Sequence, residues 1–238
     1  MQETGSREGG TLDEDFEVDN IYTSPVVKVV VGSLTQEFYV HKRHMAEVSP
    51  FFKACLSAGM MERQNNELVL PDDPCRAFRF LVGWVYNRSV PAIRNEKDAM
   101  SAVQAWTLGD KYYIPKFQNA LSDELRIFWA WDLVHPRTFL WLVENSADVT
   151  ALRQLVCDYL CYGLVHSSSM YRYACDEDEV ESPSADSYAR ALKDLLGNPE
   201  IGFELFWATN NLKRGGTDPK DFDRCYYHVH AEGQTCVW

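Results

Sequence analysis

The sequence predicts an α+β protein in which a small β-sheet is flanked by a cluster of α-helices, followed by an α-helical C-terminal extension. Short runs rich in β-branched residues lie in the first third of the chain. Beyond them, apolar residues recur at spacings of three and four, which is typical of amphipathic helices. Turn-forming Pro, Gly, Asn and Asp residues separate these segments. We therefore expect a sheet at the start of the fold and helices throughout the rest.

A β-hairpin is the first element that the sequence predicts. Val26–Val31 is a nearly continuous run of valine, which is typical of a strand that is largely buried. Gly32 follows the run and marks a turn, and Phe38–Val40 then resumes the strand pattern. The two strands are close enough in sequence to pair with each other.

Two short helices and a third strand are expected next. His41–Ala46 lacks β-branched residues and indicates the first helix. Ser49 and Pro50 are suited to the cap and first turn of the second helix. Glu67–Leu70 predicts a strand, and the turn Pro71–Pro74 both ends it and is expected to cap the next helix.

Three longer helices are predicted by apolar stripes that are expected to form the core. The first stripe contains Phe78, Leu81, Val82 and Val85. The second contains Val103, Trp106, Tyr112 and Tyr113, and Pro115 ends its helix. The third contains Phe117, Leu121 and Leu125, in a helix that follows from Lys116. In a soluble domain such stripes mainly face the core, so they are read as packing residues before any other role.

Four local motifs, taken in order, resemble those of a BTB/POZ domain. They are His41–Ala54 with its Ser-x-aromatic-Phe pattern, Tyr86–Val90 at the exit of the third helix, Leu108–Ile114, similar to an Ala-Asp-Lys-Tyr helix, and Phe117–Ala120, similar to versions common in filamentous fungi. The resemblance covers residues 25–130, less than half of the chain. It implies the BTB/POZ fold for that segment. Lys28 departs from the pattern, because many dimerising members carry an Asp near this place.

The resemblance implies a protein that binds other proteins and is not an enzyme. The first function that the resemblance implies is that of a substrate adaptor, which docks on a cullin scaffold and presents a bound protein for ubiquitin transfer. The face that would meet the cullin contains Tyr86, Asn87, Arg88, Ser89, Val90, Tyr112 and Tyr113. Half-buried packing is the alternative role of the tyrosines. The alternative function is a homo- or hetero-oligomeric scaffold or regulatory protein without a ubiquitin link, which would use the hairpin and His41–Ser57 and could form a homodimer.

Composition and charge exclude several other classes. The formal net charge is −12, yet Val26–Ala130 carries 13 basic and 11 acidic residues, so the acidity lies in the flanks. Nucleic-acid binding is not expected, since no basic stripe is available to replace phosphate counterions. No apolar run suggests a membrane span or a secretory signal. Seven cysteines without a framework indicate reduced thiols. A cytoplasmic or nuclear location is expected.

The flanking segments divide as follows. Residues 1–24 are acidic and expected to be disordered, and residues 131–212 form the helical extension. Its helices are indicated by Phe139, Leu142 and Val143 after His135-Pro136, by a stripe from Leu152 to Gly163, and by Tyr188 to Leu196 before Gly197-Asn198-Pro199. An acidic, Ser-rich loop is expected over 167–187. The C-terminal tail spans 213–238.

The tail holds the only residue cluster suited to chemistry. Cys225, His228, His230 and Cys236 offer two thiolates and two imidazoles, the ligand types and number of a tetrahedral zinc site. The spacing is irregular for a known zinc finger, so incidental residues in a polar tail are the alternative. A zinc-binding tail is thus a third, remote function, and no other cofactor is expected. Phosphate loops, nucleophile elbows and His-Glu-x-x-His are absent from the sequence.

Overall fold

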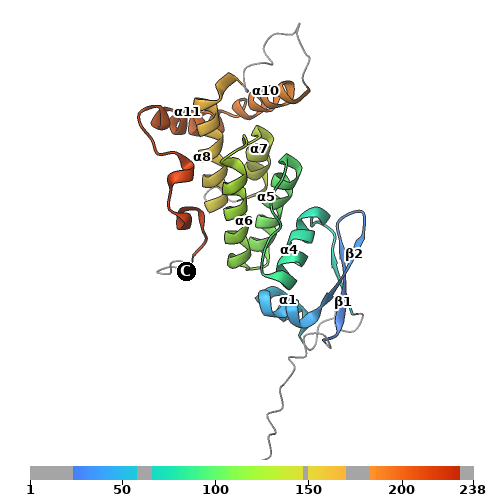
Figure 1. The fold of residues 1–238 in the computed structure, drawn as a ribbon. Helices are drawn as coiled ribbons and strands as arrows, with labels where there is room; N and C mark the ends of the chain where they lie inside the picture. The colour runs from blue at the N-terminus through green and yellow to red at the C-terminus, as the bar shows by residue number, and fades with distance from the viewer. Residues whose placement is uncertain (1–23, 58–65, 147–149, 170–182, 231–238) are drawn as a thin grey trace, which may run out of the picture.

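The computed structural model describes residues 24–57, 66–146, 150–169 and 183–230. The elements follow one another along an elongated molecule, from the sheet at one end to the last long helices at the other (Figure 1). This is the α+β architecture that the sequence predicts, with a three-stranded sheet and a helical extension. Among the described helices, none is long and apolar enough to cross a membrane.

The sheet has the strand order β2-β1-β3. β1 (Val26–Val31) pairs with β2 (Gln36–His41) in an antiparallel hairpin and with β3 (Glu67–Leu70) in parallel. Gly32, at the turn, has a φ of +71°, and a Cβ there would lie 2.7 Å from Sγ of Cys75. The turn therefore needs glycine for its backbone conformation and for its close approach to Cys75, at the start of the helix that follows β3. Both predicted strands of the hairpin are confirmed.

In the described part of the connection between β2 and β3 the chain forms two short helices, which belong to the crossover that the parallel pair β1–β3 requires. They are α1 (Lys42–Val48) and α2 (Pro50–Leu56). Ser49 caps α2 as predicted, accepting a hydrogen bond from the Phe52 N–H at 3.2 Å. Its hydroxyl also donates to the Tyr112 carbonyl at 2.7 Å, so the same residue fastens α2 to a later part of the chain.

Three helices complete the N-terminal unit: α4 (Cys75–Asn87), α5 (Glu96–Lys111) and α6 (Pro115–Trp129). Most of the predicted stripe residues are buried, including Phe78, Leu81, Val103, Phe117 and Leu121. The expectation that the turn before α4 caps it is wrong. Pro74 occupies the cap position and no side chain caps the helix.

The extension contains α7 (Pro136–Asn145), α8 (Ala151–His166), α10 (Pro183–Leu196) and α11 (Pro199–Lys213). α10 begins at Pro183, inside the segment 167–187 for which a loop is expected, and residues 170–182 lie outside the described part. Asn198 caps α11 by accepting hydrogen bonds from the N–H groups of Glu200 and Ile201. The predicted break at Gly197-Asn198-Pro199 thus separates two helices.

After α11 the chain turns back and runs along α8 and α6 (Figure 1). Two 3₁₀ turns, η2 (Pro219–Asp221) and η3 (Arg224–Tyr227), form this segment. Tyr227 is fully buried and belongs to the same hydrophobic cluster as Val27 of β1. One continuous core therefore runs from the sheet to the tail.

Candidate functional site

The first candidate site lies where α4 ends. Arg88 adopts a left-handed backbone (φ 54°) that closes the helix, and its N–H donates to the Trp84 carbonyl at 2.9 Å. Asn87, Arg88 and Ser89 are exposed, while Val90 is half-buried. Since a left-handed residue ends the helix abruptly, the chain leaves α4 at the surface and presents these side chains to solvent.

Tyr86 combines packing with exposure. Its hydroxyl accepts a hydrogen bond from the His41 N–H at 3.0 Å and lies 2.8 Å from Nδ1 of the same histidine. Its ring packs against His44 with centroids 5.0 Å apart. The side chain is still 40% exposed. Tyr86 thus joins α4 to α1 and also contributes to the outer surface.

Tyr112 and Tyr113 have opposite environments although they are neighbours. Tyr113 is 70% exposed and has a left-handed backbone, with φ 58°. Tyr112 is fully buried and donates a hydrogen bond to Asp73. Burial, and then the hydrogen bond to Asp73, raise the pKa of Tyr112. The prediction that Tyr112 forms part of an exposed face is therefore wrong, and so is the expectation that Tyr113 belongs to the core stripe.

A groove lies between the end of α4, the end of α1 and the start of α6. Its volume is about 570 Å³, and its walls are Glu47, Val48, Trp84, Arg88, Ile114, Pro115 and Lys116. Apolar groups from Val48, Trp84 and Ile114 are combined with charged groups from Glu47, Arg88 and Lys116, an arrangement typical of a protein-binding surface. Among these residues the sequence assigned only Arg88 to an interaction face, because the groove itself comes together only through the fold.

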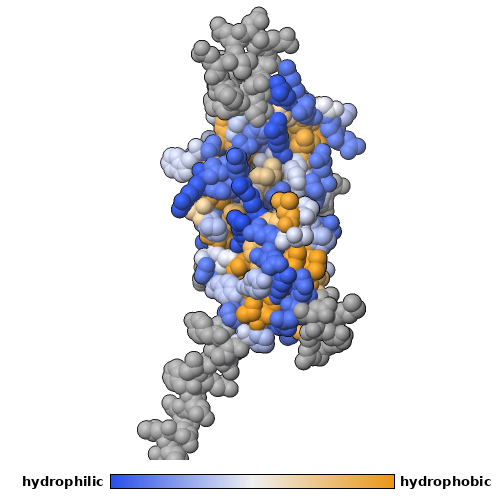
Figure 2. Space-filling model, turned by 90° about the vertical axis from the view of Figure 1, so that its right-hand side faces the viewer, coloured by the Kyte–Doolittle hydropathy of each residue, from blue (hydrophilic) through white to orange (hydrophobic). Residues whose placement is uncertain are grey.

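The surface around the sheet and the neighbouring helices shows separate hydrophobic areas set among hydrophilic ones (Figure 2). Tyr39 on β2 and Val69 on β3 are exposed by 63% and 58%. Between them, Lys28 lies 2.7 Å from Glu37 and 3.6 Å from Glu67. This outer sheet face is a second candidate surface for protein binding. It combines two exposed apolar side chains with a lysine whose charge is balanced by the two glutamates.

The cluster of cysteine and histidine residues in the C-terminal tail is a candidate metal site, in contrast to the two candidate protein-binding surfaces above. Cys225, His228 and His230 bring one potential ligand atom each to within 4.8 Å of one another. Cys236 lies outside the described residues. His228 is buried, whereas Cys225 and His230 are half-buried. Three of the four residues named from the sequence thus converge.

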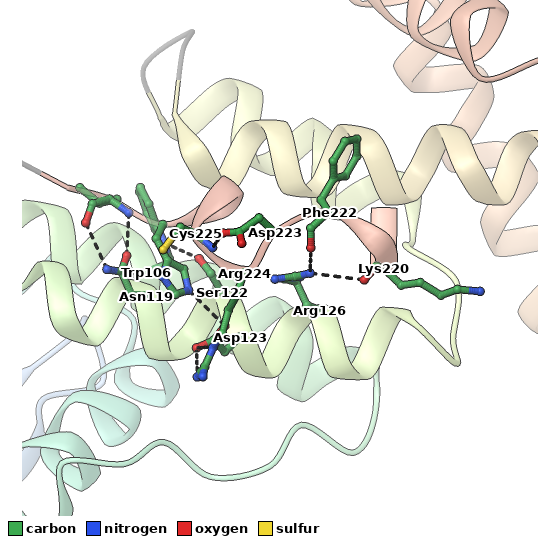
Figure 3. Close-up of polar contacts among 12 residues, drawn as sticks. Trp106, Asn119, Ser122, Asp123, Arg126, Lys220, Phe222, Asp223, Arg224 and Cys225 are labelled. Atoms are coloured by element: carbon green, nitrogen blue, oxygen red, sulfur yellow. Dashed lines mark hydrogen bonds and ion pairs between the residues drawn. The ribbon is translucent and has the colours of Figure 1, made fainter. Parts of the chain in front are cut away.

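Polar contacts hold this tail against α6 (Figure 3). Arg224 pairs with Asp123 through Nε and Nη2 at 2.5–2.9 Å, and Nε2 of His228 lies 3.1 Å from Oδ1 of the same carboxylate. Burial opposes ionisation of Asp123, but the hydrogen bonds from His228 and Arg224 outweigh it and lower the pKa of the carboxyl. Asn119 adds two bonds to the Val229 backbone, at 2.7 and 3.1 Å. No signal in the sequence pointed to Asn119 or Asp123.

Comparison with known protein families matches residues 26–126 to the BTB/POZ domain. The matched segment runs from the first residue of β1 into α6. It therefore contains every residue that lines the groove, and it contains Asn119 and Asp123, which hold the tail. No curated protein matches the chain.

Proposed function

Residues 26–126 of this chain are a BTB/POZ domain, and from that premise we propose that the protein is a substrate adaptor for a cullin-type ubiquitin ligase. The domain is a module for protein–protein interaction and oligomerisation, and it is not catalytic. In adaptors of this kind the cullin meets the loop after the third helix and the helices nearby. The corresponding part of this chain is the end of α4 with the α5–α6 junction.

The observation that supports this proposal is the groove at the end of α4, together with the exposed Tyr113 that directly precedes the wall residues Ile114 and Pro115 in the chain. Exposed aromatic residues next to a pocket are typical anchors of protein interfaces, and charged residues at the rim set orientation. Tyr113 is 70% exposed beside Ile114 and Pro115, which form one wall. Arg88 and Glu47 lie on the other side, with Nη2 and Oε2 3.5 Å apart. A helical partner segment can therefore place apolar side chains in the groove and polar ones at its rim.

The extension supports the second task of an adaptor, which is to hold a client protein. Phe203, Phe206 and Trp207 on α11 are exposed by 65%, 63% and 48%. Exposed aromatic residues in one place mark interaction surfaces more often than isolated ones do. α11 lies at the end of the molecule opposite the sheet (Figure 1). A client bound there would not compete with a cullin for the groove.

Calorimetric titration tests the proposal. We expect the purified full chain to bind the N-terminal region of a cullin that accepts BTB adaptors with micromolar or tighter affinity. Tyr113→Asn should weaken binding about tenfold or more, since aromatic anchors are worth over 1 kcal/mol. Asparagine tolerates the left-handed backbone, so this variant should fold. Tyr39→Asn, a similarly exposed tyrosine on the sheet, is the matched control and should bind like the parent.

Two results would oppose the adaptor function. One is the absence of any heat of binding with cullins of this type. The other is an equal loss of affinity for the cullin in the Tyr113→Asn and Tyr39→Asn variants. That result would mean that the cullin does not bind specifically at the groove.

A homo- or hetero-oligomeric scaffold is the alternative, supported by the outer sheet face. Lys28 stands where many dimerising members carry an Asp, and Glu37 and Glu67 compensate its charge. Val69→Lys would place a charge in the apolar part of this face. A dimer in sedimentation that this variant abolishes, together with no cullin binding, would favour the scaffold. For either function we propose a cytoplasmic or nuclear location, with which the five described cysteines agree, since none of them forms a disulfide.

A further inference from the structure

We propose that Cys225, His228 and His230 bind a zinc ion within the part of the C-terminal tail that packs on α6. One thiolate and two imidazoles are ligands that zinc prefers, whereas magnesium and calcium prefer oxygen. Tetrahedral zinc takes four ligands, and these three described residues supply three of them. The inference is independent of the adaptor function, because none of its residues lines the groove.

The backbone explains why these three residues converge. Cys225 and His228 are three positions apart across η3, and in a 3₁₀ turn the side chains at i and i+3 lie above one another. The His228 N–H donates to the Cys225 carbonyl at 3.0 Å and closes this turn. His228 itself has an extended backbone (φ −97°, ψ 151°). In extended backbone the residues at i and i+2 share a face, so His230 returns to the side of His228.

The separations agree with a site that closes slightly around the ion. Bonds of about 2.0–2.3 Å in tetrahedral geometry place neighbouring ligand atoms about 3.3–3.6 Å apart. The three potential ligand atoms lie within 4.8 Å of one another. A movement of about 1 Å, within the range of side-chain rotation, brings them to bonding distance.

Asp123 supplies the outer contact that metal-binding histidines normally have. Nε2 of His228 lies 3.1 Å from Oδ1 of Asp123. A histidine whose one ring nitrogen donates to a carboxylate coordinates through the other, and the carboxylate fixes the ring and raises its basicity. Coordination by His228 would therefore use Nδ1. Arg224, which contacts both oxygens of Asp123, keeps the carboxylate in place.

The segment that carries the ligands is held by contacts of its own. Asn119 of α6 bonds both backbone groups of Val229, and the Tyr227 hydroxyl donates to Asp158 of α8 at 2.9 Å. Figure 3 shows Arg224 and Cys225 over α6, beside Asn119, Ser122 and Asp123. Because this segment is already ordered, little conformational entropy is lost when the ion binds.

The test is metal analysis of the purified full chain, followed by removal of metal with a chelator and titration with Zn²⁺ against a competing indicator. We expect one zinc per chain. Cys225→Ser and His230→Asn should each weaken binding by about a hundredfold or more, and Asp123→Asn by about 10–100-fold. Cys55→Ser, which removes a thiol outside the cluster, is the control and should bind like the parent. Co²⁺ should give a thiolate charge-transfer band in the parent that is lost in Cys225→Ser.

Thermal unfolding gives a second readout. Zn²⁺ added to the metal-free parent should raise its midpoint, because a ligand that binds only the folded state stabilises it. It should not raise the midpoint of Cys225→Ser or His230→Asn, whose circular dichroism should match that of the parent. A parent that neither holds zinc nor responds to it would overturn the proposal, as would variants that bind Zn²⁺ as tightly as the parent.

Discussion

The role of Asp73 in the structure differs from the role that the sequence predicts. It lies in the turn before α4, where a capping role is expected, but it is 3% exposed and faces α5 instead. Nζ of Lys111 contacts its Oδ1 at 2.7 Å, and the Tyr112 hydroxyl donates to its Oδ2. A buried carboxylate needs such partners, because an uncompensated charge in the interior is costly. Asp73 therefore fastens the end of β3 to the end of α5.

Replacing Tyr112 by Phe should test this network. The change removes only the hydroxyl and leaves Asp73 with one bond fewer at a buried position, so we expect a loss of about 1–3 kcal/mol in the free energy of unfolding. Urea denaturation followed by circular dichroism measures it. Tyr113→Phe removes the same atom from an exposed side chain and should change stability by less than about 0.5 kcal/mol. Equal effects of the two substitutions would contradict the account.

The different environments of Tyr112 and Tyr113 could not be predicted from the sequence. Apolar spacing predicts both as part of one stripe, and the family resemblance predicts both as part of one surface. The left-handed backbone at Tyr113 turns the chain there, with the Ile114 N–H donating to the Gly109 carbonyl at 2.8 Å. A positive φ at a non-glycine residue leaves no signal in residue spacing. The structure was needed to separate a core residue from a surface one.

At the scale of elements, His135 lies where three helices meet. It caps α7 by accepting a hydrogen bond from the Arg137 N–H at 3.1 Å, and its ring packs in a tilted arrangement against Tyr188 of α10, with centroids 4.3 Å apart. Nδ1 lies 3.6 Å from Glu96 of α5. Burial, with a smaller contribution from the charge of Arg137, lowers the pKa of His135 from 6.5 to about 4. The histidine is therefore neutral when the helices are packed.

This lowered pKa predicts that stability falls on acidification. Between pH 6.5 and about 4 the unfolded chain binds a proton that the folded chain does not, so the free energy of unfolding decreases as the pH is lowered through this window. The contribution is on the order of 3 kcal/mol. Urea midpoints measured across the window should fall less steeply in His135→Asn, whose side-chain oxygen can still cap α7. The same slope in parent and variant would show that His135 plays no part.

The sequence predicts the helices and strands better than it predicts the contacts between them. Ser49-Pro50 identified the start of α2, and Phe117, Leu121 and Leu125 identified the buried face of α6, because caps and helical spacing are local signals. The groove was not predicted. Glu47, Trp84 and Lys116 belong to three elements, and only the packing of α1, α4 and α6 places them around one volume.

At the scale of the molecule, the BTB domain and the extension share one core. Trp129 of α6 lies against Tyr159 of α8, with ring centroids 6.2 Å apart, and the Tyr159 hydroxyl bonds the Arg126 carbonyl at 3.4 Å. Arg126 in turn donates to the Phe222 carbonyl of the tail at 2.8 Å. The extension therefore covers a face of α6 that would otherwise be exposed.

A chain that ends at residue 130 should accordingly be less stable than the full chain. Its α6 would expose Trp129 and neighbouring apolar groups, so we expect a lower urea midpoint and increased binding of a hydrophobic dye. The full chain should unfold in a single transition when followed by circular dichroism and by tryptophan fluorescence. Two separate transitions, or a shortened chain as stable as the full one, would show that the parts are independent.

The central claim concerns the groove at the end of α4, and calorimetry of the full chain with the N-terminal region of a cullin that accepts BTB adaptors tests it most directly. The account predicts micromolar or tighter binding that Tyr113→Asn weakens at least about tenfold and Tyr39→Asn leaves unchanged. Absence of binding, or binding that Tyr113→Asn does not alter, would contradict it.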